Sequence, residues 1–423
     1  MIRWPASALP RKIAQDLRAS YWFTPASMVI LALLAAVGTE QLDRWGVTAW
    51  VPRWYYGTTA DAARSVLTVI ASASIGAAGV MFSMTVVAVS FASTNFGPRL
   101  IRNFMQDRGV QVSLGTLLST FVFALIILRG IRGGQEGAAM VPALSVTCAL
   151  ALALVSVAVM IYFVHHIPEL ISLENIAAAL GCRLLQAIDE MPRAAHPTAD
   201  GPDDGEPVYA VRLDSAGFLQ AVNCQGLADL ADRSGMRLRI RKWPGDFVAP
   251  HMAVADLRGP EAPSDGLRAD IADCFALGSS RTEAQNPLFI AKQLTEIIAR
   301  ALSPGVNDPF TAMTCLNWLH AALHRLAERG PVSPVDPDGL DQSTPFSFVD
   351  MLAVAHEIPR AYLADDAATA VHAYGLLLDL IEALPPGPRR SVVLDEARTL
   401  LAEARARQPH SAQIAALPAP PEK

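Results

Sequence analysis

The stretch GAAGVMFSMTVVAVSFASTNFGPRL (residues 76–100) is apolar enough to cross a lipid bilayer, yet it carries Gly, Ser and Thr at regular intervals. It belongs to an apolar segment, 62–94, of about 33 residues. As a helix this segment would be roughly 50 Å long, well beyond a hydrocarbon core of about 30 Å. At 100° per residue, small or hydroxylated residues project within an arc of about 80°: Thr68, Ser72, Gly76, Gly79, Ser83, Ser90 and Thr94. The segment predicts a long transmembrane helix with one small, partly polar face.

This small-residue stripe has two interpretations. Small residues let the backbones of two membrane helices approach, and Ser and Thr hydroxyls bond back to their own helix. Alternatively, stripes from several subunits line a narrow polar path, because hydroxyls coordinate weakly without the cost of a buried charge. In that case Asp61 and Arg64 would lie at the outer mouth and Asn95 at the inner mouth. The two interpretations agree if the packing partner is the same helix of another subunit.

Three further apolar runs, 22–38, 113–131 and 141–164, predict a four-helix transmembrane domain. Arg and Lys are concentrated before the first span and between the second and third spans, in two groups: Arg3, Arg11, Lys12 and Arg18, then Arg99, Arg102 and Arg108. The positive-inside rule therefore predicts that both termini are cytoplasmic.

The rest of the chain has the composition of a soluble protein. Short alternating runs separated by turn residues occupy 208–257 and predict a small cytoplasmic β-barrel. From about residue 267 the pattern is helical. The predicted parts are a four-helix transmembrane domain (1–168), a helix and linker (169–207), a β-barrel (208–260), a cytoplasmic α-helical domain (261–408) and a disordered tail (409–423).

Two shorter motifs carry a structural prediction. After Gly97-Pro98, the segment 99–109 predicts an interfacial helix that places Arg99 and Arg102 against lipid phosphates. The segment 301–310 breaks one helix and starts the next, which predicts a tight corner rather than an anion site at the helix N-terminus. The residues of this corner motif are Ser303, Pro304, Gly305, Asn307, Asp308 and Pro309.

Few residues point to catalysis. The spacing of His320 and His324, with Glu328 one turn later, can place two imidazoles on one metal ion. The chain has no HExxH motif, however, so we expect a solvated helix edge, no metal and no cofactor. The pair at 165–166 is expected to anchor the membrane interface rather than to gate by pH. The five cysteines are scattered, and a net charge of −6 without a basic run argues against nucleic acid as a partner.

Two segments together carry a resemblance: MFSMTVVAVSFASTNFGPRLIRNFMQDRG (81–109) and QNPLFIAKQLTEIIARALSPGVNDPFTAM (285–313). They resemble a family of predicted bacterial membrane proteins known as domain of unknown function 2254, over most of the chain. The resemblance implies a multi-pass protein of the bacterial inner membrane and no established activity. The family typically has an acidic residue where this chain has Asn286.

These observations predict a homo-oligomer in the lipid bilayer that assembles about the small-residue stripe. The first hypothesis is a passive channel for an inorganic ion or small solute, gated or assembled by its cytoplasmic domains. The alternative is a membrane-anchored sensor or scaffold whose cytoplasmic domains bind a partner or small ligand, the stripe serving only helix packing. No catalytic motif supports an enzyme.

Overall fold

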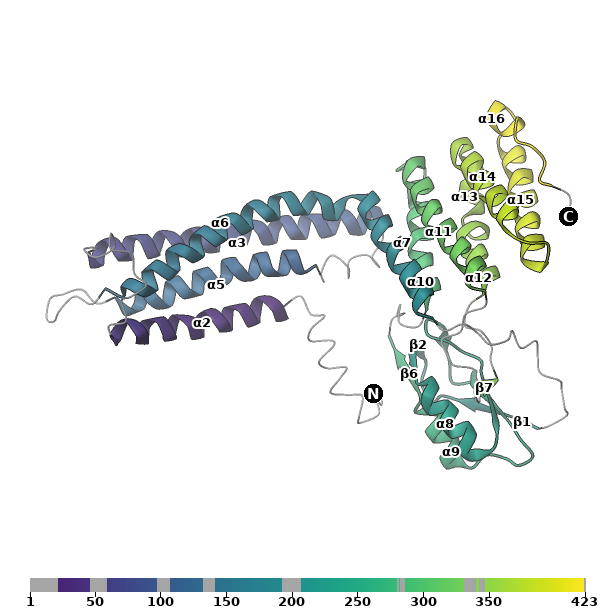
Figure 1. The fold of residues 1–423 in the computed structure, drawn as a ribbon, viewed down its shortest axis with the longest axis horizontal. Coiled ribbons are helices and arrows are strands. Elements are labelled where there is room, and N and C mark those ends of the chain that lie inside the picture. The colour runs from purple at the N-terminus through teal and green to yellow at the C-terminus, as the bar shows by residue number, and fades with distance from the viewer. Residues whose placement is uncertain are drawn as a thin grey trace. The chain divides into compact units, whose positions relative to one another are not determined.

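The structure, a computed structural model, describes residues 22–45, 59–96, 107–131, 141–191, 207–279, 281, 286–330, 340–341 and 347–421. The chain divides into two compact units. The first comprises the described residues up to Ser172, and the second begins at Leu173. Each unit is described by itself, with the element labels of Figure 1.

Among the described residues, the first unit is built from α2 (Phe23–Arg44), α3 (Ala60–Phe96), α5 (Arg108–Gly130) and α6 (Ala143–Ile171). All are long and apolar enough to cross a bilayer, which confirms the predicted spans as helices. They run side by side in one elongated bundle (Figure 1). With 37 residues, α3 is about 55 Å long and exceeds the thickness of a hydrocarbon core.

The central helix of this bundle is α5, which packs against α2, α3 and α6. Its buried side is rich in small and hydroxylated residues, namely Ser113, Gly115, Thr116, Ser119 and Thr120. A Cβ atom at Gly115 would lie 2.6 Å from the sulfur of Met28 and 3.2 Å from the Cα of Pro25, both on α2. Thr120 Oγ1 lies 2.8 Å from Ser156 Oγ of α6. Small side chains on α5 therefore let its neighbours approach closely.

Polar side chains at the helix ends join the helices to one another. The Asp43 carboxylate, at the end of α2, accepts hydrogen bonds from the N–H groups of Leu144 (2.9 Å) and Ser145 (3.0 Å) at the start of α6. These N–H groups have no acceptor within their own helix. Arg64 of α3 donates to the carbonyl of Ile131, just beyond α5, at 2.9 Å. Arg64 therefore caps a neighbouring helix, and its expected place at the outer mouth of a path stays a prediction.

In the second unit, the predicted β-barrel is wrong: the described strands form two separate sheets. The first has the order β1 (Val208–Arg212), β5 (Ala253–Arg258), β3 (Arg237–Ile240) and β7 (Leu340–Asp341). The second has the order β4 (Phe247–Val248), β2 (Gly217–Val222) and β6 (Phe275–Gly278). Adjacent strands are antiparallel except for β3 and β7, which are parallel. Two strands, β6 and β7, lie beyond residue 260, where the barrel was expected to end.

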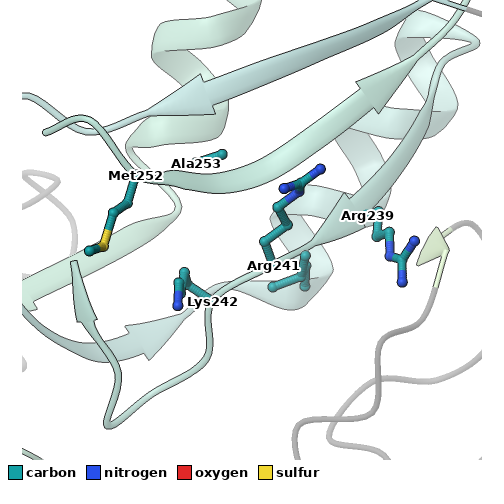
Figure 2. A pocket seen from close by; sticks show the side chains of 6 residues that line it. Arg239, Arg241, Lys242, Met252 and Ala253 are labelled. Carbon is teal, nitrogen blue, oxygen red and sulfur yellow. The ribbon is translucent and has the colours of Figure 1, made fainter. Parts of the chain in front are cut away.

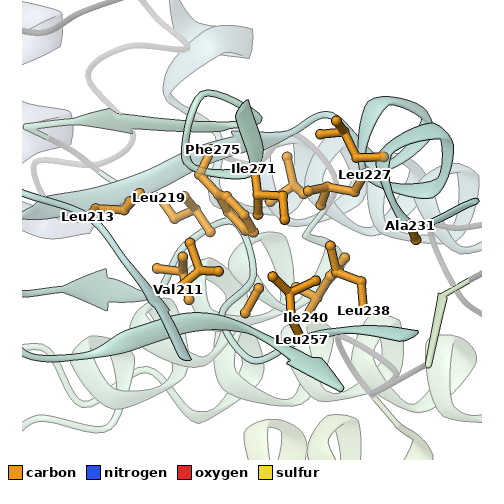
Figure 3. Packing of buried hydrophobic residues seen from close by; sticks show 14 of the residues in the cluster. Val211, Leu213, Leu219, Leu227, Ala231, Leu238, Ile240, Leu257, Ile271 and Phe275 are labelled. Atoms are coloured by element: carbon orange, nitrogen blue, oxygen red, sulfur yellow. The ribbon is translucent and has the colours of Figure 1, made fainter. Parts of the chain in front are cut away.

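Two helices cover the part of the core that the two sheets leave open. The core between the sheets is completed by α8 (Cys224–Ser234), which contributes Leu227 and Ala231, and by α9 (Asp265–Ala272), which contributes Ile271. Figure 3 shows these side chains packed against strand residues such as Leu219 and Leu257. Strands of two to six residues are too short to enclose this core alone, and α8 and α9 bury the remaining apolar surface.

The remaining helices pack in succession. They are α7 (Leu173–Glu190), α10 (Pro287–Ala301), α11 (Pro309–Arg329), α12 (Phe348–Leu352), the π-helix η2 (Ala353–Glu357), α13 (Arg360–Asp365), α14 (Ala367–Ala383) and α15 (Pro388–Arg407). α11 packs against α7, α10 and α14, and α14 packs against α15. A Cβ at Gly181 of α7 would lie 2.1 Å from the Trp318 ring of α11, so only glycine fits this approach.

The tail at 409–423, predicted to be disordered, instead forms α16 (Ala412–Ala415) in its described part. Ile414 is 1 % exposed, and the Tyr374 hydroxyl of α14 donates to the Pro418 carbonyl at 2.7 Å. Arg405 of α15 also donates to the Leu417 carbonyl, at 3.0 Å. Apolar burial and side-chain hydrogen bonds to backbone carbonyls thus hold a segment whose Pro- and Ala-rich composition is typical of disorder.

Candidate functional site

The small-residue stripe of α3 faces away from the bundle. Its residues with described side chains are all exposed in the protomer: Thr68, Ser72, Gly76, Gly79, Ser83 and Ser90. The face that packs against the other helices is a different one, made of Ala63, Leu67, Ile70, Ala71, Ser74, Ala78, Met81, Thr85 and Ala88. A helix that packs on the stripe must therefore come from outside the described part of this chain.

The glycines of this α3 stripe leave open space. A Cβ atom at Gly76 or Gly79 would meet no other atom within 4 Å. Thr68 Oγ1 donates to the Arg64 carbonyl of its own helix at 2.8 Å, as membrane-embedded threonines commonly do. The stripe is thus a shallow, weakly polar face, flanked by bulky exposed residues such as Phe82 (47 % exposed) and Met84 (48 % exposed).

The C-terminal end of the stripe is only partly described. Thr94 and Asn95 lie within α3, but their side chains are outside the described set. Arg99 and Arg102, and with them the predicted interfacial helix up to residue 106, lie outside the described residues. Their proposed role at an inner mouth therefore stays a prediction.

Nearby, at the start of α5, Asp107 joins two helix ends. Its Oδ1 accepts from the N–H of Val110 at 2.8 Å and lies 3.1 Å from Nε2 of His166, on α6. Tyr162 stacks on the His166 ring, with the ring centroids 5.0 Å apart. His166 therefore belongs to the packing between α5 and α6, whereas His165 is largely exposed.

The corner motif forms the predicted turn between α10 and α11. Asp308 caps α11, because its Oδ1 accepts from the N–H of Thr311 at 3.1 Å. The Asp308 N–H in turn donates to the Ala301 carbonyl at 2.8 Å, and Asn307 adopts a positive φ of 49°. Ser303 donates to the Arg300 carbonyl at 2.6 Å, while Pro304, Gly305 and Pro309 complete the turn. Asp308 itself occupies the helix N-terminus, which leaves no room there for an anion.

His320 and His324 do lie on one side of α11, but Glu328 does not join them. Glu328 pairs with Arg325 at 3.3 Å, and Arg325 also binds Asp189 of α7 at 2.6 Å. The acidic partner of the two histidines is Asp379 of α14, whose Oδ2 lies 2.9 Å from His320 Nε2. Nothing in the local sequence identifies Asp379, because it is 55 residues or more from both histidines.

A pocket in the β-sheet region was not expected from the sequence. It has a volume of about 620 Å³ and is lined by Arg239 and Ile240 of β3, by Arg241 and Lys242 just beyond β3, and by Met252 and Ala253 around the start of β5. Figure 2 shows the labelled basic side chains together with Met252 and Ala253. Arg241 also pairs with the buried carboxylate of Asp256. The alternating run MRLRIRKW (236–243) is the sequence signal that could have located this basic surface.

The thiols of Cys315, which is buried, and Cys224, which is partly buried, are poor nucleophiles. Burial raises the pKa of the Cys315 thiol to about 12 and that of Cys224 to about 11. Both thiols stay protonated near neutral pH, and a protonated thiol is a poor nucleophile.

Comparison with known proteins places the chain in a family. The family described as predicted membrane protein, DUF2254, matches residues 18–379. The chain belongs to this family. The DUF2254 match includes the α3 stripe, the corner motif and the helices through most of α14. No solved structure matches significantly.

Three mycobacterial relatives of this DUF2254 chain carry the name uncharacterized protein. They are Mb1321c of Mycobacterium bovis, and Rv1290c and MT1328 of two Mycobacterium tuberculosis strains. Each is 30 % identical over 330 residues, which cover 75 % of this chain and 63 % of the relative. The match thus spans less than two thirds of the length of these relatives.

Proposed function

We propose that this membrane protein assembles as a homo-oligomer through the α3 stripe, and that the assembled stripes line a passive path for an ion or small solute. The observation that carries the proposal is the outward orientation of the stripe. A face of glycine and hydroxyl residues offers little apolar surface to lipid tails, but it lets a second copy of the same face approach closely.

The extent of the stripe supports this role. Thr68 and Ser90 are 22 positions apart, which corresponds to about 33 Å along a helix and is close to the thickness of a hydrocarbon core. Between Ser65 and Phe96, α3 contains no Asp, Glu, Lys, Arg or His. Coupled transport usually requires an ionisable group within the membrane, so a passive path fits this helix better than a proton-coupled one.

In this proposal the protein lies in a bacterial inner membrane with both termini in the cytoplasm. Asn95, Arg99 and Arg102 then lie at the inner mouth of the path. The second unit then gates or assembles the oligomer from the cytoplasmic side. The corner motif contributes to this gating or assembly role only by holding α10 and α11 in a fixed arrangement.

The test is ion flux into liposomes that contain the purified protein. Ser83→Leu fills the stripe, and Met84→Leu is its matched control, because Met84 is the next residue, exposed, and about 100° around the helix. The proposal expects wild-type flux that falls at least tenfold in Ser83→Leu and is unchanged in Met84→Leu. Oligomer size is measured for each protein in detergent. A monomeric wild type, or equal flux in all three proteins, contradicts the proposal.

A sensor or scaffold is the second candidate, and the basic pocket of the β-sheet region is the observation that favours it. Arg239, Arg241 and Lys242 line a space large enough for a small anionic ligand. In that case the α3 stripe serves packing alone, and Ser83→Leu leaves the protein's activity unchanged as long as it folds. The same liposome experiment therefore separates the two candidates.

A further inference from the structure

Three side chains at the interface between α11 and α14 converge on a single point. His320 Nε2, His324 Nε2 and Asp379 Oδ2 lie 3.0, 2.9 and 3.1 Å from one another in pairs. The two imidazole rings meet edge to face, with centroids 4.5 Å apart and an angle of 80° between their planes. The two histidines are one helical turn apart, and Asp379 approaches from the facing helix.

Hydrogen bonds alone cannot satisfy this triangle. A neutral imidazole carries one ring proton, and an ionised carboxylate carries none. If both Nε2 atoms are protonated, the contact between them brings two N–H groups together. If one is bare, its lone pair faces either the carboxylate or an N–H that is already engaged. At least one of the three short contacts is therefore left without a hydrogen bond.

A cation that accepts all three lone pairs removes this conflict. Zn²⁺ binds imidazole nitrogen and carboxylate oxygen at about 2.0–2.2 Å, and at these lengths tetrahedral ligands lie roughly 3.3 Å apart. The observed separations are only slightly shorter. An ion at that distance from all three atoms lies about 1 Å out of their plane, so a fourth coordination position remains on its far side.

Metal binding through both Nε2 atoms requires that each neutral imidazole carries its proton on Nδ1. Imidazoles in this form and an ionised carboxylate release no proton when they bind a metal ion. Asp379 is 64 % exposed and His324 31 %, so an ion can enter from solvent, whereas His320 (11 % exposed) anchors the inner side.

Other polar groups surround this triangle. One turn earlier along the same interface, His372 Nε2 of α14 lies 2.7 Å from Asn317 Oδ1 of α11. His356 lies in the π-helix η2 and is 1 % exposed, and neither of its ring nitrogens has a hydrogen-bond partner among the described residues. Burial first, and the charge of His320 second, lower the pKa of His356 to about 3, so it stays neutral. Single-turn π-helices often occur at functional sites.

We propose that His320, His324 and Asp379 form a binding site for a divalent transition-metal ion, best suited to Zn²⁺. The ion joins α11 to α14 and keeps one coordination position for water or an exogenous ligand. Three protein ligands with one open position are typical of catalytic rather than structural zinc sites. The site is independent of the path proposed for α3, because it depends only on contacts within the second unit.

The test uses the full-length protein, purified in detergent and stripped of metal with a chelator. Zn²⁺ is titrated against a chromophoric competitor, and bound zinc is counted by elemental analysis. The proposal expects one Zn²⁺ per chain, an affinity at least tenfold lower in Asp379→Asn, and a larger loss in His320→Gln. His251→Gln, in an exposed turn of the β-sheet region, is the matched control and keeps wild-type affinity.

A second measurement separates loss of a ligand from loss of the fold. The thermal midpoint without metal should be similar in wild type and Asp379→Asn, and Zn²⁺ should raise it only in the wild type and in His251→Gln. X-ray absorption of the zinc-loaded protein should show only nitrogen and oxygen ligands, including imidazole. The proposal is overturned if the wild type binds no Zn²⁺, or if Asp379→Asn folds normally and binds zinc as tightly as the wild type.

Discussion

Two helices of the membrane unit carry small and hydroxylated residues, and they use them in opposite ways. On α5 these residues are buried, and Gly115 and Thr120 are in direct contact with α2 and α6. In the α3 stripe they are exposed, and a Cβ atom at Gly76 or Gly79 would meet no other atom within 4 Å. The same residue types thus lie at helix contacts on α5, whereas in the α3 stripe they form a face that packs against none of the other described helices.

The difference between them is one of position in the bundle. α5 packs against three helices, so the small residues on its buried side meet a neighbour. α3 also contacts the bundle, through a face that combines Leu67, Ile70 and Met81 with small residues such as Ala71 and Ser74, and the residues of the stripe lie elsewhere on the helix. A pattern of small residues therefore predicts that another helix can approach closely, but it does not identify which helix that is.

The largest expected effect comes from the matched pair Gly115→Leu and Gly79→Leu. Leucine at 115 collides with Met28 and with the backbone of Pro25, which cannot rotate away. Overpacking of this kind lowers the free energy of unfolding by about 1–3 kcal/mol or more. The Cβ of a leucine at 79 would meet no atom within 4 Å, so this variant should leave protomer stability unchanged while disrupting the proposed oligomer.

Thermal unfolding and size-exclusion chromatography in detergent check both variants of this pair. The distinction between the two helices fails if Gly79→Leu unfolds as readily as Gly115→Leu. The proposed assembly fails if Gly79→Leu keeps the oligomer size of the wild type.

The second unit also contains a glycine at a helix contact, Gly181, and an exposed glycine, Gly375. Alanine at 181 places a Cβ 2.1 Å from the Trp318 ring, which must move, so we expect a loss of about 2 kcal/mol in the free energy of unfolding. Alanine at 375, an exposed position in α14, meets nothing within 4 Å and should stabilise the helix by about 0.5–1 kcal/mol. Thermal midpoints that shift in opposite directions confirm the prediction, and equal shifts contradict it.

The smallest expected effect is the difference in stability between two threonine-to-valine variants, at positions 120 and 68. Thr120→Val removes the hydrogen bond to Ser156 between α5 and α6 and should cost about 0.6–2 kcal/mol in the membrane. Thr68→Val removes only a bond to its own helix backbone, and we expect a change below about 0.5 kcal/mol. Chemical denaturation in mixed micelles measures both. Equal destabilisation would show that the cross-helix bond contributes nothing beyond the local one.

Local sequence determined much of this fold. Apolar runs located the transmembrane helices because a bilayer imposes a minimum length on any span. Alternation located β1 to β5, and Asp308-Pro309 located the start of α11, because capping and proline geometry depend on adjacent residues. Asp107 also follows the local capping rule, because its side chain accepts from the N–H of Val110, three residues later, at the start of α5.

Tertiary structure decided what local rules cannot reach. β6 and β7 join sheets whose other strands are far away in the chain, so the barrel predicted from 208–260 was wrong. The orientation of the α3 stripe depends on which faces of four helices bury the most surface together. The His320, His324 and Asp379 triangle exists only because α14 packs on α11, which brings a carboxylate to two imidazoles across a gap of 55 residues. Side-chain spacing along one helix is set by the backbone, whereas contacts between helices are set by the packing of the whole chain.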